Sequence, residues 1–268
     1  MPPVQSRPMA SRTWDRAGSL PVAVGDGPGP ELVALPGAAL LSVEALFTFM
    51  RDAERRFETL RMRVEEVKAA AGGDVVVATE VLLEHPARAR VTTTEPAGDL
   101  TGNYEVWLSD GARVRTYSAR HRLATDRPVR PRVRGADAAD LPGFARVYRP
   151  LTPLPMESLP DLFVHPAGYC QNVLATGRCD VLGTAGIVDR EAILLRSAHP
   201  RAVERWADRP DFAIELLVDR ETGCILRLTE LMGEAVTRDA RVVVFEPDAP
   251  LPPSAFELAV PEGATTIF

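Results

Sequence analysis

Histidine and cysteine are the side chains in this chain best suited to metal binding or nucleophilic catalysis, and there are four histidines and three cysteines. His165, Cys170 and Cys179 lie closest together, with four and eight residues between successive members. These separations match no usual structural zinc pattern, and no motif supports Cys170 and His165 as a nucleophile and its base. We therefore expect no metal site and no catalytic residue. An enzyme that acts on a hydrophobic small molecule through Cys170 and His165 stays open as an alternative.

The cysteines also fit no disulfide framework. Cys170 and Cys179 are close enough in the sequence to pair in an exported protein, but free thiols are the interpretation that we favour. Cys224 lies in an apolar stretch and is expected in the core.

Lysine is almost absent, because Lys68 is the one lysine among 31 basic residues. Phosphate-loop, Schiff-base and Ser-Lys chemistries therefore lack their usual residue. The stretch 25–30 is rich in glycine, but no strand precedes it, and its prolines remove donors that a phosphate cradle needs. The sequence thus names no enzymatic activity, and we expect a non-enzymatic protein without a cofactor.

The charges are distributed unevenly along the chain. The net charge of −6 counts against a general nucleic-acid-binding protein. Residues 111–149, however, contain ten arginines against three aspartates, a local charge of +7 that leaves −13 for the rest. Arginine grips phosphate through two parallel hydrogen bonds. Arg130, Arg132 and Arg134 are therefore candidates for docking to an anionic membrane surface or an acidic partner, and a solvated loop is the alternative.

Proline marks the irregular parts of the chain. Of 24 prolines, 20 fall before residue 41, between 128 and 166, or between 247 and 261. Because proline is excluded from strand and helix interiors, we expect tail or loop in these stretches. The predicted organisation is a disordered or loosely packed Pro/Gly-rich tail over 1–41 and a single domain over 42–268 with an insert at 119–166.

No stretch of the sequence resembles a membrane span or a secretory signal. The most apolar early run, 32–41, is interrupted by Pro36 and Gly37 and is shorter than the ~20 residues that a spanning helix needs. The first thirty residues lack the continuous apolar block of a signal peptide. The sequence as written therefore predicts a cytoplasmic location, and a misassigned start codon would leave an extracytoplasmic one open.

Hydrophobic spacing predicts one amphipathic helix, followed by strands. Ser42 is expected to cap the helix, and apolar residues at the i, i+3, i+4, i+7 spacing continue to about Phe57. The period then changes to an alternation of apolar and polar residues, which is typical of half-buried strands. Five strands in meander order are predicted at 60–64, 75–83, 87–94, 104–108 and 112–118.

A second set of strands is predicted after the insert. These strands lie at 186–197, 212–218, 224–232 and 240–246. With about nine strands joined by tight turns, the sequence predicts an α+β, mainly β fold. Its main element is one curved antiparallel sheet covered by the N-terminal helix and by short helices of the Pro-rich insert.

The order of four segments resembles that of a known superfamily. The segments are FETLRMRVEE (57–66), YEVWLSDGARVRTYSA (104–119), LLVDRETGCILRLTEL (216–231) and FELAVPEGA (256–264). Together they resemble the LolA/LolB-like lipoprotein-localisation superfamily, which includes actinobacterial lipid-binding lipoproteins and RseB-like regulators. The resemblance covers roughly 43–264. The chain departs from the family pattern in having neither an export signal nor a lipobox cysteine.

The resemblance implies a strongly curved, open half-barrel that binds acyl chains between sheet and helices without catalysis. The implied partner is a lipid or an acylated protein, and an RseB-like regulatory module is the alternative. That the aromatic and aliphatic candidates are ordinary core residues also stays open. The candidates for lining the cavity are Phe47, Met50, Met62, Trp107, Tyr117, Phe212, Ile214 and Leu226.

Overall fold

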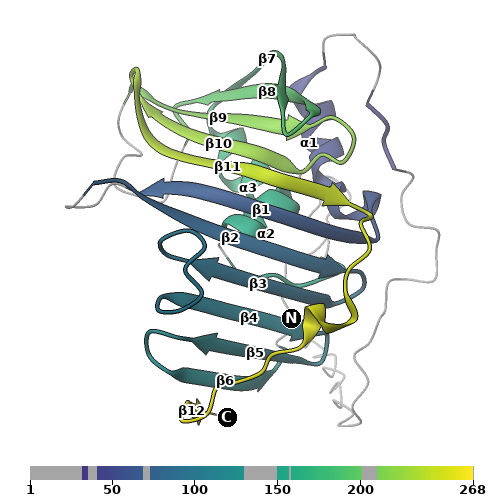
Figure 1. Cartoon of the computed structure of the whole chain (residues 1–268). Coiled ribbons are helices and arrows are strands. Elements are labelled where there is room, and N and C mark those ends of the chain that lie inside the picture. The colour runs from purple at the N-terminus through teal and green to yellow at the C-terminus, as the bar shows by residue number, and fades with distance from the viewer. Residues whose placement is uncertain are drawn as a thin grey trace, which may run out of the picture. The chain divides into compact units, whose positions relative to one another are not determined.

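In its described part, the computed structural model contains one curved sheet with three short α-helices over one of its faces (Figure 1). The structure describes residues 32–35, 41–68, 73–129, 150–156, 158–200 and 210–267. All of them lie within one unit, Leu32–Phe268.

The strands occupy most of the described chain. The first six are β1 (Thr59–Lys68), β2 (Val75–Glu84), β3 (Arg88–Thr94), β4 (Tyr104–Asp110), β5 (Arg113–Ser118) and β6 (Leu123–Pro128). The later ones are β7 (Arg178–Ile187), β8 (Arg190–Ala198), β9 (Phe212–Asp219), β10 (Ile225–Met232), β11 (Ala235–Pro247) and β12 (Thr265–Ile267). The helices are α1 (Val43–Arg51), α2 (Leu159–Val164) and α3 (Ala167–Asn172), with 3-10 turns η1 (Ala53–Arg56), η3 (Leu174–Thr176) and η4 (Pro253–Phe256).

Two meanders meet at β1, which lies near the middle of the sheet. The strand order is β12-β6-β5-β4-β3-β2-β1-β11-β10-β9-β8-β7. The first meander runs outward from β1 to β6, and the second runs from β7 back to β11, which pairs with β1. All neighbours are antiparallel except β12 and β6. The chain between β6 and β7 therefore connects one side of the sheet to the other, and it carries α2 and α3.

The N-terminal helix begins as predicted but ends earlier. Ser42 caps α1 by accepting a hydrogen bond from the backbone N–H of Ala45. The helix stops at Arg51, because the backbone of Asp52 leaves the helical conformation and the chain continues as η1. The Asp52 carboxylate is buried and accepts two hydrogen bonds from Arg51, at 3.0 and 2.7 Å. This ion pair stabilises the break between α1 and η1.

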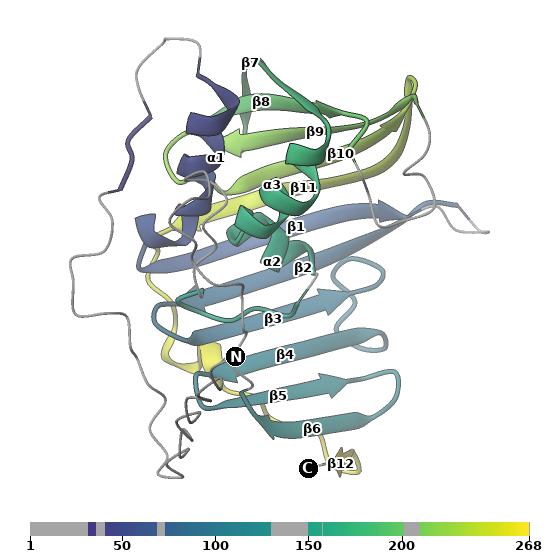
Figure 2. The same cartoon turned by 180° about the vertical axis from the view of Figure 1, so that it is seen from behind.

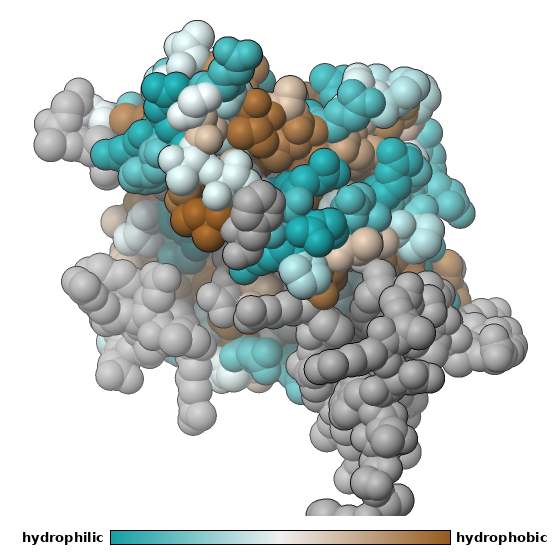
Figure 3. All heavy atoms as spheres, turned by 90° about the horizontal axis from the view of Figure 1, so that it is seen from below, coloured by the Kyte–Doolittle hydropathy of each residue, from teal (hydrophilic) through white to brown (hydrophobic). Residues whose placement is uncertain are grey.

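The two faces of the sheet are covered differently. The helices lie over the inner face (Figure 2), where the main hydrophobic cluster is found. On the outer face, the chain after β11 crosses the first meander, and Ala255 and Phe256 pack against Leu108. Arg90 holds this segment by donating to the carbonyl oxygens of Ala255 and Glu257, at 3.5 and 3.1 Å. The segment ends in β12, and the surface at that end mixes hydrophilic and hydrophobic side chains (Figure 3).

The structure confirms the predicted fold class, an open and strongly curved antiparallel sheet covered by an N-terminal helix and further short helices. It contains three strands that the sequence patterns did not predict as such: β6, β12 and most of β7. Both β6 and α2 lie within the range 119–166, predicted as an insert. Of the predicted tail, 1–31 and 36–40 lie outside the described residues, so the tail stays a prediction.

Candidate functional site

Six of the eight predicted cavity-lining residues lie in one cluster on the inner face. All six are at most 3% exposed. They are Phe47 and Met50 of α1, Met62 of β1, Phe212 and Ile214 of β9, and Leu226 of β10. The sequence patterns therefore identified a set of side chains that the fold brings together.

Trp107 and Tyr117 lie on neighbouring strands but on opposite faces. Val106 pairs with Tyr117, and Trp107 pairs with Thr116. Because successive residues of a strand point to opposite faces, Tyr117 shares a face with Val106 and not with Trp107. Trp107 packs against the inner cluster. Tyr117 is buried on the outer face, 5.8 Å from the Tyr104 ring, so the structure separates it from the other seven.

The helices fill the interior that the sheet and α1 enclose. Phe163 of α2 and Cys170 of α3 are fully buried in the same cluster, as is Leu174 of η3. The Cys170 sulfur lies 3.8 Å from the sulfur of Met50, which links α3 to α1. In this structure the space between the helices and the sheet is therefore occupied by the protein's own side chains, and a ligand there requires the helices to move.

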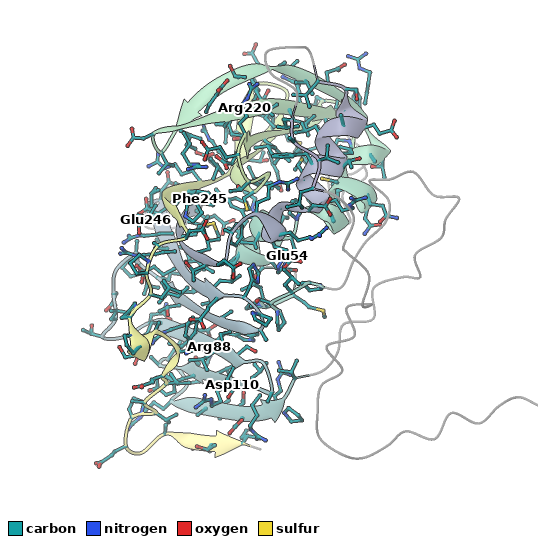
Figure 4. All side chains as sticks on the ribbon, turned by 90° about the vertical axis from the view of Figure 1, so that its right-hand side faces the viewer. Glu54, Arg88, Asp110, Arg220, Phe245 and Glu246 are labelled. Carbon is teal, nitrogen blue, oxygen red and sulfur yellow. The ribbon has the colours of Figure 1, made fainter. Side chains whose placement is uncertain are left out.

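A buried ionic cluster joins the helices to one another. The Nε2 atom of His165 lies 2.9 Å from a carboxylate oxygen of Glu54 in η1, although the contact lacks the alignment of a hydrogen bond. The Nδ1 atom lies 2.9 Å from a carboxylate oxygen of Asp161 in α2. The His165 side chain is 2% exposed. We call Glu54, Asp161 and His165 the ionic clamp; Figure 4 shows Glu54 where η1 approaches the sheet.

The ionic clamp keeps His165 positively charged at neutral pH. Burial alone lowers the pKa of His165, but the two carboxylates outweigh burial and raise it to about 9. For the acidic Glu54, burial acts in the opposite direction and raises the pKa. The positive charge of His165 outweighs burial, so the pKa of Glu54 lies below its ordinary value. Each charge of the pair therefore stabilises the other in a site from which water is largely excluded.

A second set of polar contacts fixes the chain where it returns to the helices after β6. The backbone N–H of Leu151 donates to Glu54 at 3.0 Å. The hydroxyl of Thr152 lies 2.7 Å from Nδ1 of His85 and accepts from the N–H of Ala87 at 2.8 Å. Burial lowers the pKa of His85, whose ring stacks on Phe57. These contacts tie the β2–β3 turn, the segment 150–156 and η1 together.

The alternative of a Cys170–His165 catalytic pair finds no support in these contacts. His165 is occupied by two carboxylates, and the thiol of Cys170 faces Met50. Burial raises the pKa of Cys170 well above its usual range, which disfavours the nucleophilic thiolate. Cys179 donates instead to the carbonyl oxygen of Leu174, and Cys170, Cys179 and Cys224 are all free thiols. Across the described ranges, no three histidine, cysteine or acidic side chains form a metal-binding group.

Sequence reasoning selected His165 but missed both of its partners. Asp161 precedes His165 by one helical turn, and that spacing is a usable signal once α2 is recognised. Glu54 is more than a hundred residues away, so only the tertiary structure identifies it. Arg130, Arg132 and Arg134 lie outside the described residues, and their role in anionic docking stays a prediction.

An open cavity of about 680 Å³ lies at one end of the helices, and sequence reasoning did not anticipate it. Arg56 forms part of its wall and donates to three backbone carbonyls, those of Phe49, Thr222 and Val33, at 2.8, 3.2 and 3.0 Å. Its guanidinium also lies over the Phe49 ring. The cavity walls mix apolar and charged groups: Leu32, Val33, Ala34, Leu35, Phe49, Arg55, Arg56, Phe57, Glu58, Arg220, Glu221 and Asp248.

The turn VDRETG at 218–223, part of one of the four segments behind the family resemblance, has a structural role. The buried Asp219 accepts two hydrogen bonds from Arg190, at 2.6 and 3.0 Å, and two from the backbone and hydroxyl of Thr222. Gly223 adopts a φ of +82°, and a Cβ there would lie 3.1 Å from Phe49. The motif thus seats α1 against the end of the sheet.

We expect Gly223→Ala to lower the free energy of unfolding by about 2–3 kcal/mol, because it adds a close contact with Phe49 to backbone strain. Gly98→Ala is a matched control, since Gly98 has a φ of +86° and a Cβ there meets nothing within 4 Å. The control should lose only about 1 kcal/mol. Urea denaturation of the two variants measures the difference, and equal losses would show that the contact with Phe49 is unimportant.

Several solved structures are similar to this chain at low sequence identity. No family model and no curated protein matches the chain. MucB matches at 14% identity and a TM-score of 0.47, covering 81% of this chain and 62% of MucB. LprF from Mycobacterium bovis matches at 11% identity and 0.36, covering 85% and 100%. The LolA superfamily protein NE2245 from Nitrosomonas europaea matches at 12% identity and 0.31, covering 81% and 98%.

A LolA superfamily protein, LprF and MucB are thus among the solved structures to which this chain is similar. The chain spans less than two thirds of the MucB chain. Within the described part of the chain, no helix is long and apolar enough to cross a membrane. The predicted location stays a prediction.

Proposed function

We propose that the protein binds an apolar ligand, the acyl chain of a lipid or of an acylated protein, between its curved sheet and its helices, without catalysing a reaction. The observation that carries this proposal is the composition of the interface between the two layers. The inner face of the sheet and the facing sides of α1, α2 and α3 form one continuous apolar cluster. An aliphatic chain needs such a surface and few polar groups.

The attachment of the helices also supports the proposal. α2 and α3 have six residues each. Besides their apolar packing, they are held by the ionic clamp and the Cys170–Met50 contact, and η3 is held by the hydrogen bond from Ser197 to the Leu174 carbonyl. Such elements move at lower cost than strands in a sheet, whose backbone hydrogen bonds would have to break. Displacement of α2 and α3 would open the apolar cluster to which Met62 and Leu226 belong, and methionine adapts its shape to varied apolar ligands.

Native mass spectrometry of the purified full chain tests the proposal directly. We expect co-purified lipid, seen as additional mass that is lost on delipidation. The delipidated protein should then bind cis-parinaric acid with a dissociation constant of about 1–10 μM, because burying an acyl chain contributes about 0.8 kcal/mol per CH₂ before the cost of moving the helices.

Two alanine variants locate the bound probe. Met62→Ala enlarges the interior and should change the parinaric acid affinity at least about fivefold, since packing contacts with a buried chain are sensitive to cavity volume. Phe256→Ala is the matched control, because it removes apolar volume from the outer-face cluster instead. A protein that carries no lipid and binds no probe, or one in which both variants behave alike, would contradict binding in the interior.

A further inference from the structure

The two edges of the sheet differ in how their strands are paired. At one edge, the C-terminal segment crosses the outer face to add β12, whose residues pair with Leu123, Ala124 and Thr125 of β6. At the other edge, β7 pairs with β8 on one side, and no strand among the described residues pairs with its other side. Because an unpaired edge presents free N–H and C=O groups, it can accept a further strand.

The second half of β7 lacks the features that usually prevent edge pairing. Charged side chains, proline and bulges block such edges in native proteins. The first half of β7 contains Arg178 and Asp180, and a bulge follows between Val181 and Gly183. From residue 181 to residue 188 there is neither a charge nor a proline. The open stretch is therefore 184–187, between the bulge and the turn to β8.

The backbone of this stretch is accessible. A Cβ added to Gly183 or Gly186 would meet nothing within 4 Å. A surface hollow of about 710 Å³ is lined by residues 184–191. Thr184 and Gly186 are exposed and line this hollow, so a strand at the ~4.8 Å spacing of a sheet can reach them.

The turn that ends β7 determines which backbone groups face outward. Ile187 pairs with Arg190 across a two-residue turn, in which Val188 and Asp189 both have positive φ. A type I′ turn closes with a hydrogen bond between the first and fourth residues, so the groups of Ile187 face β8. Backbone groups alternate along an antiparallel strand, and therefore those of Thr184 and Gly186 point away from the sheet.

We infer that β7 is a self-association edge, where residues 184–186 pair antiparallel with the same residues of a second copy of this chain. Thr184 of each copy lies opposite Gly186 of the other, so the outward groups of both strands are satisfied around a two-fold axis. The residues that face one another across this ladder are all uncharged, so like charges do not repel each other there. A ladder of three residues in each strand buries less than the ~1,200–2,000 Å² of a stable interface, so the dimer is weak.

Sedimentation equilibrium of the full chain tests this pairing. From about 5 to about 500 μM, the mean mass should rise from 29.1 kDa towards twice that value, with a dissociation constant of about 100 μM. Hydrogen exchange of the amides of Thr184 and Gly186 should slow in parallel with dimer formation. A monomer at every concentration would overturn the assignment. The same holds if a foreign peptide protects these amides while the chain itself stays monomeric.

One variant and its control locate the interface. Gly186→Lys places a charge on the open edge of each copy and should weaken dimerisation at least about tenfold. Gly168→Lys in α3 is matched, because a Cβ there also meets nothing within 4 Å, and it should leave the mass profile unchanged. A dimer that survives Gly186→Lys would place the interface elsewhere and would overturn the inference.

Discussion

Replacing Asp219 with asparagine should lower the free energy of unfolding by about 3–5 kcal/mol, the largest loss that we expect from a single conservative substitution in this protein. The Asp219 carboxylate is buried and receives two hydrogen bonds from Arg190, at 2.6 and 3.0 Å. An amide of the same size cannot accept both, and it leaves Arg190 with the exposed Glu221 as its remaining partner. Urea denaturation at neutral pH measures the loss.

The matched control is Asp239→Asn on the outer face. Asp239 also receives two hydrogen bonds from one arginine, Arg227, at 2.7 and 3.1 Å. The two pairs have similar geometry and differ in burial, since the Asp239 side chain is 22% exposed and that of Asp219 is 1% exposed. Asp239→Asn should therefore cost about 0–1 kcal/mol. Equal costs would mean that burial does not set the strength of the Asp219–Arg190 pair.

Replacing His165 with glutamine should destabilise the protein by about 3 kcal/mol at pH 6 and by much less above pH 9. At pH 6 the wild-type His165 carries the positive charge that balances Glu54 and Asp161. Glutamine removes this positive charge from between the two carboxylates. Above its pKa of about 9, wild-type His165 is neutral as well, so the two proteins should approach each other in stability.

The sign of the pH dependence follows from the direction of the pKa shift. The pKa of His165 is raised from 6.5 to about 9 on folding, so its contribution is fully present below pH 6.5 and is lost as the pH rises through 9. The loss is on the order of 3 kcal/mol. The lowered pKa of Glu54 has its effect at acidic pH, where the stability of the folded state is lost as the pH falls below 4.5. The lowered pKa of His85 also makes the folded state less stable as the pH falls below 6.5, because the folded state favours the neutral form of His85.

Denaturation of both proteins at about pH 6, 7.5 and 10 measures this effect as a difference, which removes contributions that the two share. His121→Gln serves as the control, because His121 is exposed and lies outside the ionic clamp. A constant difference between wild type and His165→Gln across this range would indicate that His165 acts by packing alone.

Local patterns were sufficient to predict most of the regular structure. Ser42 was predicted as a helix cap because its side chain acts on an amide three residues away. Strands β1 and β3 were predicted from alternating residues, which are typical of a strand with one buried side. Strands β6 and β12 were missed because both lie at the far side of the sheet, where a strand can form with little burial and therefore with a weak alternating pattern.

The candidate site was predictable only in part. The apolar candidates of α1, β1, β9 and β10 meet in one cluster because each lies on the buried side of its own element, a property visible in the sequence. Tyr117 also lies on a buried side, but of the outer face, where the C-terminal segment crosses the first meander. Single-strand periodicity cannot tell which face of a sheet a residue occupies when both faces are covered.

The sequence by itself determined the helix, the turns and the two meanders, because spacing and turn residues act over a few positions. It also contained the VDRETG motif, although not the reason for it. Only the tertiary structure decided that Glu54 and Asp161 hold a charged His165, that side chains fill the interior, and that β12 joins β6 whereas no described strand pairs with the outer side of β7. These properties depend on residues far apart in the chain. Their energies arise from burial, which exists only once the sheet has formed.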